Sequence, residues 1–157
     1  MASLMEFEVY ATYRQVIVLD PSLTTSYNCW IGDHVRQGFS WRPGAASFAT
    51  RVNGGRVRIR VELGGQLTVP DDAVRAVVVP FGVTGDTIEV GSIFDARPCP
   101  VPTGTYELLF AIVPATDSAP ETCCLQFVPC ANPAPRHLRV DDDLEPLDPP
   151  LMEAEPG

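Results

Sequence analysis

Two long apolar runs in the middle of the chain dominate its hydrophobic pattern. They cover residues 76–83 and 105–114 and consist mainly of β-branched, aromatic and other apolar side chains. Pro80 and Pro114 would break a helix in either run, and neither run shows the 3.6-residue spacing of a helical face. Such runs, bounded by proline or glycine, are typical of strands buried on both faces. We therefore predict that both are central strands of an all-β core.

Residues 56–63 alternate strictly between apolar and charged side chains. A strand with this pattern has one face on the core and one in solvent. The charged face carries the stripe Arg56, Arg58 and Arg60, which could bind phosphate or an acidic partner. We favour a solvated face whose arginines pair with acids on neighbouring strands.

Residues 6–19 are predicted to form the first strand. Two-residue periodicity places one set of side chains on its inner face: Phe7, Val9, Ala11, Tyr13, Ile17 and Leu19. The remaining expected strands cover residues 46–51, 74–83, 87–94, 105–113 and 122–128. Asn53-Gly54-Gly55 is a signal for a tight hairpin, and the proline-rich residues 97–104 predict a corner.

A short helix is expected within residues 30–38. Gly38 would close it in a left-handed C-cap, and Trp30, Ile31 and Val35 would face inward. Together with the strands, this gives an antiparallel β-sandwich of about seven strands with one short helix.

The chain changes character after residue 130. Residues 141–157 hold 7 of the 20 acids and no base, and residues 131–157 are rich in proline. A segment with so little apolar surface cannot offset the entropy lost on ordering. We therefore predict a sandwich domain over residues 1–130 and a disordered, acidic C-terminal tail over residues 131–157.

Charge and hydropathy exclude several classes of function. The net charge of −9 opposes direct binding of nucleic acid. No run of about 18 apolar residues is present, so no membrane span is expected. The N-terminus lacks the charged and apolar regions of a signal peptide, and we predict a cytoplasmic protein.

The candidate chemistry in the sequence is sparse. The five cysteines, an odd number, indicate free thiols packed as small apolar residues. Cys123, Cys124, Cys130 and His137 form the densest set of soft ligands, but adjacent cysteines in a strand point to opposite faces, so no metal is expected. A dyad of Cys29 with His34 is conceivable, although a surface histidine is the commoner case. No nucleotide-binding motif is present, and we predict no cofactor and no enzymatic activity.

Several segments resemble the competence protein J family of bacteria. The resemblance lies in residues 77–93, in residues 101–108 and in residues 112–115. The N-terminal part is also similar, through Tyr13-x-Gln15-x-x-Val18, Trp30 before the expected helix, Gly38-Phe39 and Ser47-Phe48. The likeness covers roughly residues 6–128, and the acidic tail departs from it.

The resemblance implies a non-enzymatic protein that binds and silences a DNA-entry nuclease. No catalytic residue is carried over, and the expected partner is a protein, with no direct contact to nucleic acid. Acidic side chains on loop edges or in the tail would bind the arginine and lysine side chains of the nuclease that normally hold DNA phosphates. The candidate partner-binding residues are Asp86, Glu89, Asp95, Asp141, Asp142, Asp143 and Glu145. Two alternatives stay open: an immunity protein against another toxin nuclease, and a sandwich that binds Ca²⁺ or another ligand through loop carboxylates.

Overall fold

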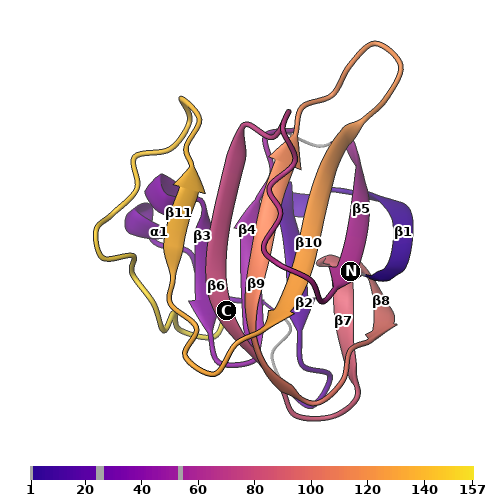
Figure 1. The fold of residues 1–157 in the computed structure, drawn as a ribbon. Helices are drawn as coiled ribbons and strands as arrows, with labels where there is room; N and C mark the ends of the chain where they lie inside the picture. Colours follow the sequence, from indigo (N-terminus) through magenta and orange to yellow (C-terminus); the bar gives the residue numbers. More distant parts are fainter. Residues whose placement is uncertain (1, 24–26, 53–54) are drawn as a thin grey trace.

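The computed structural model describes residues 2–23, 27–52 and 55–157, and these form two packed β-sheets (Figure 1). One sheet has six strands in the order β1-β5-β10-β9-β6-β11, and the other has five in the order β3-β4-β2-β7-β8. The first sheet consists of β1 (Ala2–Tyr10), β5 (Arg56–Leu63), β6 (Arg75–Val83), β9 (Gly104–Val113), β10 (Glu121–Pro129) and β11 (Arg136–Arg139). The second consists of β2 (Gln15–Leu19), β3 (Phe39–Arg42), β4 (Ala45–Ala49), β7 (Thr87–Ser92) and β8 (Asp95–Pro100). The all-β fold is confirmed.

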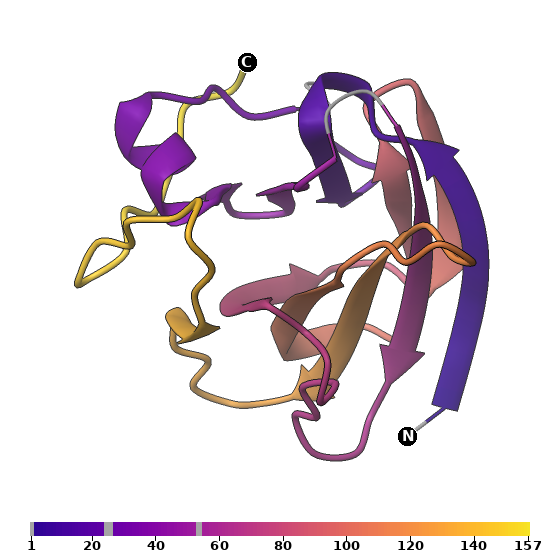
Figure 2. The ribbon, with the colours of Figure 1, turned by 90° about the horizontal axis from the view of Figure 1, so that it is seen from above.

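The core lies between the two sheets, as Figure 2 shows from above. Strands β6 and β9, which contain the two long apolar runs, pair along their full length as inner strands of the larger sheet. Phe110 on β9 stacks on Phe48 of β4 across the sandwich, with ring centroids 4.4 Å apart. The indole N–H of Trp41 on β3 donates to the carbonyl of Pro80 on β6, which ties the two sheets together.

Strand β5 has the predicted alternation. Its apolar face is buried, while Arg58 and Arg60 on the other face form ion pairs with Glu6 and Glu8 of the adjacent β1. The pair β5–β10 is parallel, and every other strand pair described is antiparallel.

The prediction of one strand over residues 6–19 is wrong. The chain leaves β1, turns through the 3-10 helix η1 (Thr12–Arg14) and enters β2 in the other sheet. The turn changes the alternation, so Val16 and Val18 face the main core, and Ile17 and Leu19 pack in a separate cluster.

Two further details differ from the predictions. The proline-rich corner contains strand β8, which pairs with β7 at the edge of the smaller sheet, where prolines without N–H donors are tolerated. The predicted hairpin at Asn53-Gly54-Gly55 includes residues 53–54, outside the described residues. The strands on either side, β4 and β5, lie in different sheets and are not hairpin partners.

The short helix α1 (Gly32–Gln37) forms as expected and ends at Gly38, whose φ of 85° is left-handed. Its inner face is the opposite of the predicted one. His34 and Gln37 are buried, while Ile31 and Val35 are 52% and 61% exposed. No helix within the described residues is long and apolar enough to cross a membrane.

The structure does not confirm a disordered tail. Strand β11 pairs with β6 as the last strand of the larger sheet, and the chain then crosses to α1 and the smaller sheet (Figure 2). Leu144 is buried, and its neighbour Glu145 donates its backbone N–H to the carbonyl of Arg36. The Gln37 amide exchanges two hydrogen bonds with the backbone of Leu151. The division of the chain at residue 130 stays a prediction.

Candidate functional site

A tight turn between β1 and β2 displays Tyr13 beside Phe94 of the β7–β8 hairpin. Tyr13 and Arg14 both have left-handed backbones, with φ of 55° and 58°, which side chains other than glycine rarely adopt. The turn is held by the Arg14 N–H, which donates to the Ala11 carbonyl, and by the Thr50 N–H, which donates to the Arg14 carbonyl. Tyr13 is 70% exposed and lies 6.2 Å, between ring centroids, from Phe94, which is 77% exposed. Such strain clusters at functional sites.

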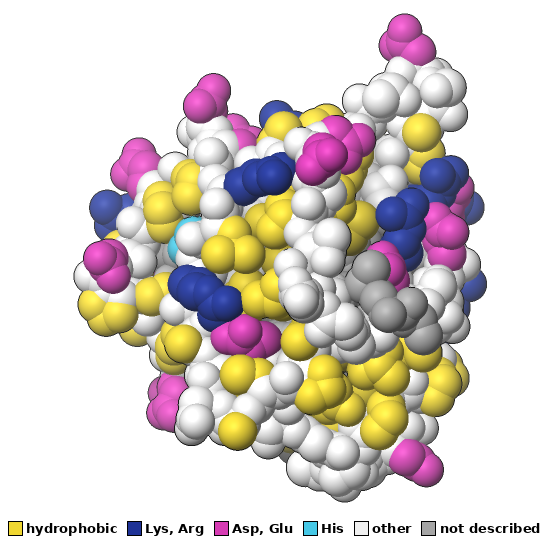
Figure 3. Space-filling view, viewed as in Figure 1, with side chains coloured by type: hydrophobic (Ala, Val, Ile, Leu, Met, Phe, Trp, Pro, Cys, Tyr) yellow, Lys and Arg dark blue, Asp and Glu magenta, His cyan; other side chains and the backbone are white. Residues whose placement is uncertain are grey.

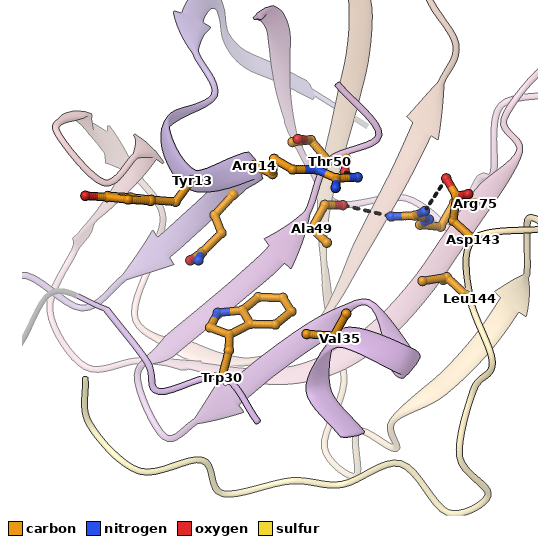
Figure 4. Close-up of a pocket in the computed structure, with 10 residues that line it drawn as sticks. Tyr13, Arg14, Trp30, Val35, Ala49, Thr50, Arg75, Asp143 and Leu144 are labelled. Atoms are coloured by element: carbon orange, nitrogen blue, oxygen red, sulfur yellow. Dashed lines mark hydrogen bonds and ion pairs between the residues drawn. The ribbon is translucent and has the colours of Figure 1, made fainter. Parts of the chain in front are cut away.

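A pocket of about 450 Å³ lies between this turn, α1, the end of β4 and the tail (Figure 4). Trp30 and Val35 form the wall on the side of α1, and Tyr13 and Arg14 form the opposite side. The complete lining is Tyr13, Arg14, Gln15, Trp30, Val35, Ala49, Thr50, Arg75, Asp143 and Leu144. Tyrosine, tryptophan and arginine dominate binding energy at protein interfaces, so the lining suits a protein partner.

A buried ion pair fixes the tail side of the pocket. Arg75 donates from Nε and Nη2 to the two carboxylate oxygens of Asp141, at 3.1 and 3.0 Å, and from Nη1 to the Ala49 carbonyl at 3.0 Å. The side chains of Arg75 and Asp141 are only 3% and 7% exposed. Arg51 lies 3.3 Å from the same carboxylate. Asp141 therefore anchors the tail and places Asp143 and Leu144 at the pocket.

Helix α1 begins with a hydrogen bond to a histidine. The Ile31 N–H donates to Nδ1 of His34, at 3.0 Å, so the neutral ring carries its proton on Nε2. That Nε2 is buried and finds no hydrogen-bond partner among the described residues, and the same holds for the indole nitrogen of Trp30. Burial lowers the pKa of His34, and the nearby Asp33 opposes the shift. With Nδ1 engaged, His34 is not positioned to act as a base toward Cys29.

The predicted partner-binding acids fall in three places. Asp86 lies in the turn between β6 and β7, and its carbonyl accepts the Val101 N–H. Glu89 and Asp95 lie on the β7–β8 hairpin, where Asp95 is 3.7 Å from Arg97. The remaining acids, Asp141, Asp142, Asp143 and Glu145, lie in the tail. Asp141 is buried, whereas Asp142, Asp143 and Glu145 are exposed.

The other predicted candidates behave as ordinary structural residues. Cys123 and Cys124 face different apolar clusters, and burial raises the pKa of both thiols. Burial also raises the pKa of Cys99 to about 11. Within the described ranges, no group of three or more His, Cys, Asp or Glu side chains is placed to hold a metal ion.

Of the residues around the pocket, Asp143 belongs to the predicted partner-binding acids and the others do not. The predicted elements place Tyr13 and Arg14 inside a strand and turn Val35 toward the core. Residues 11–15 contain no glycine or proline, so nothing in them indicates a left-handed turn. The one available signal is the polar Gln15, which interrupts the apolar alternation after Tyr13.

Comparison with known proteins shows the relationship of the chain to a family. The family model for competence protein J (ComJ) matches residues 8–128. The chain belongs to the competence protein J family. No curated protein matches the sequence.

Two solved structures are similar to this ComJ-family chain. The first is the crystal structure of ComJ, inhibitor of the DNA degrading activity of NucA, from Bacillus subtilis; it has a TM-score of 0.70 at 25% identity, with 82% of this chain and 97% of that chain covered. The second is a protein named crocagin biosynthetic gene J, with a TM-score of 0.55 at 13% identity, covering 82% and 99% of the two chains. The second likeness concerns the fold alone.

The match to the family ends where the tail of this chain begins. Tyr13, Trp30, Val35 and Phe94 lie inside the matched residues 8–128, whereas Asp143 and the rest of the tail lie outside. The pocket therefore joins a part that the family model describes to a part that it does not.

Proposed function

We propose that this chain is a non-enzymatic inhibitor that binds and silences a DNA-degrading nuclease. The observation that carries the proposal is the similarity to ComJ of Bacillus subtilis, inhibitor of the DNA degrading activity of NucA, over 97% of that protein. Membership of the family over residues 8–128 supports it. The protein would act in the cytoplasm on a protein partner, without binding DNA itself.

The mechanism would be steric and electrostatic. A nuclease holds the polyanionic DNA backbone with arginine and lysine side chains, and an acidic protein of net charge −9 is attracted to such a groove. The acids proposed for this contact are Asp86, Glu89, Asp95, Asp142, Asp143 and Glu145. Asp141, which the sequence also suggested for this contact, is left out of the set because its carboxylate already binds Arg75.

The test is a DNA-cleavage assay with purified components. The nucleases are NucA of Bacillus subtilis and any nuclease encoded next to the gene of this chain, each mixed with increasing amounts of the folded protein. Loss of cleavage at about equimolar protein is expected for at least one of them. A heat-unfolded sample and an unrelated acidic protein are the controls. Undiminished cleavage by both nucleases at a large molar excess would contradict the proposal.

One observation favours a related second function. The tail lies outside the family match, so this chain has a surface segment that the family model does not describe. The partner can therefore be a toxin nuclease, with this chain as its immunity protein. Rescue of cells that express such a toxin, without inhibition of NucA, would support this second function.

A further inference from the structure

The geometry points to the pocket between Tyr13, α1 and the tail as the surface on which the chain docks against the basic DNA-binding groove of the nuclease. This inference rests on the proposed function and specifies where the contact is made. We call this region the aromatic surface and define it by Tyr13, Trp30, Ile31, Val35 and Phe94. Its rim on the tail side is formed by Asp142, Asp143 and Glu145.

Exposed apolar side chains are concentrated on the aromatic surface. Four of the large hydrophobic residues that are exposed within the described chain belong to the aromatic surface: Tyr13, Ile31, Val35 and Phe94. Tyr13, Phe94 and Val35 are connected, because Tyr13 contacts Phe94 on one side and lines the pocket with Trp30 and Val35 on the other. Ile31 follows Trp30 directly in the chain. A contiguous apolar patch with a polar rim is typical of protein interaction sites.

The turn that carries Tyr13 is already formed in the free protein. The strained turn at Tyr13 and Arg14 is held by backbone hydrogen bonds to Ala11 and Thr50, and the Arg14 guanidinium donates to the Thr50 carbonyl at 3.5 Å. A turn whose backbone is already held in place loses little backbone entropy on binding, so more of the contact energy appears as affinity. The hollow between them can receive a protruding side chain of the partner (Figure 4).

The acidic charge of the rim identifies a basic groove as the occupant of this surface. Asp141 is neutralised by Arg75 at 3.0 Å. Asp143 and Glu145 lie farther from arginines, 4.0 Å from Arg51 and 3.9 Å from Arg36, and their side chains remain 59% and 80% exposed. Figure 3 shows acidic side chains spread over the edge of the molecule where Figure 1 draws the tail. An apolar centre with an acidic rim complements a groove whose walls carry the arginine and lysine side chains that bind DNA phosphates. Asp86 lies in a turn at the other end of β6 from Arg75, outside the aromatic surface and its rim.

The two parts of the surface have separable effects. Aromatic anchors that become buried on binding determine mainly the dissociation rate, whereas rim charges determine mainly the association rate and its dependence on salt. The anchors lie within the family match and the rim lies outside it. The rim would thus adapt the common surface to the nuclease that this chain recognises.

The experiment measures binding to the nuclease that the wild-type chain inhibits, by surface plasmon resonance at several salt concentrations, together with DNA cleavage. Val35→Asp and the double variant Tyr13→Ala/Phe94→Ala alter two different elements, so one remains informative if the other fails to fold. Each is expected to raise Kd about 30-fold or more, through faster dissociation. The triple variant Asp142→Asn/Asp143→Asn/Glu145→Gln is expected to slow association about tenfold and to flatten its salt dependence.

The matched controls alter equivalent residues elsewhere. Leu138→Ser changes an exposed apolar residue of β11, and Asp71→Asn/Asp72→Asn/Asp117→Asn removes the same charge from exposed loops. Both should bind like the wild type. Normal binding by both aromatic variants, or weaker binding by the control triple than by the rim triple, would overturn the inference while leaving the proposed function intact. Dimerisation of the free protein that Val35→Asp abolishes would also overturn it, because a second copy would then occupy the surface. If the wild type itself fails to inhibit, the proposed function fails first.

Discussion

Replacing Asp141 with asparagine tests whether the tail is held by its buried ion pair. The substitution preserves the shape of the side chain but leaves the Arg75 guanidinium, 3% exposed, without its charged partner. Removing one member of a buried pair costs about 3–5 kcal/mol, because the remaining charge stays desolvated. The lower end applies here, since Asp143 lies 3.9 Å from the same guanidinium and supplies part of the missing charge.

A loss of about 3 kcal/mol corresponds to a fall in Tm of roughly 6–12 °C for a domain of this size. The measurement is a thermal melt followed by circular dichroism, with urea unfolding at 25 °C to obtain the free energy directly. Asp142→Asn is the control, because Asp142 is exposed and forms no ion pair with any described residue. Its Tm should change by no more than the equivalent of about 0.5 kcal/mol.

A double variant separates the pair from its surroundings. Arg75→Met/Asp141→Leu removes both charges and keeps apolar volume, so it should recover most of the stability lost in Asp141→Asn. If Asp141→Asn melts within 1 °C of the wild type, or if the double variant is less stable than the single one, the buried pair does not anchor the tail and the reasoning is refuted.

Three further outcomes are expected. Deletion of residues 131–157 should lower the Tm substantially, and trypsin should cleave the intact tail slowly; an unchanged Tm would show that the tail is disordered as first predicted. Gly38→Ala should destabilise by about 1–2 kcal/mol, because φ is 85° and the new Cβ would lie 2.9 Å from Leu144 Cδ2. Gly32→Ala, with open space around its Cβ, should be neutral or stabilise by about 0.5 kcal/mol, and equal urea midpoints for these two variants would contradict the capping role. His34 has a lowered pKa when folded, so the unfolded chain binds more protons below its ordinary pKa and stability should fall as the pH drops from 7.5 to 5.5; an equally steep fall in His34→Asn would exclude this residue as the cause.

The sequence predicted the parts of the fold that depend on local pattern. The runs that form β6 and β9, the alternation in β5 and the left-handed cap at Gly38 all appear in the structure. In each case a short-range rule, either side-chain periodicity or the conformational freedom of glycine, agrees with the tertiary environment. The ion pairs of Arg58 and Arg60 with β1 followed from the same alternation.

The missed features depend on contacts between distant residues. Nothing near Tyr13 indicates the left-handed turn, which is held by Thr50, the residue directly after β4. The tail has the composition of a disordered segment, yet Arg75 lies 66 residues before Asp141 and needs its carboxylate. A buried arginine within an apolar strand pattern was a sign that an acid must come from elsewhere. For the same reason, the pocket could not be predicted, because its walls come from five separate segments.

The separation of Arg75 from Asp141 also has a consequence during protein synthesis. When β6 leaves the ribosome, its arginine has no carboxylate to neutralise it until 66 more residues have followed. The larger sheet is equally incomplete, because β5 needs β10 as its parallel neighbour and β6 needs β11 at its edge. A chain that terminates early therefore keeps an uncompensated charge and an open sheet edge, which favours its degradation. Both are covered only when residues 136–141 are present, so this one short segment completes the ion pair and the β6 side of the larger sheet together.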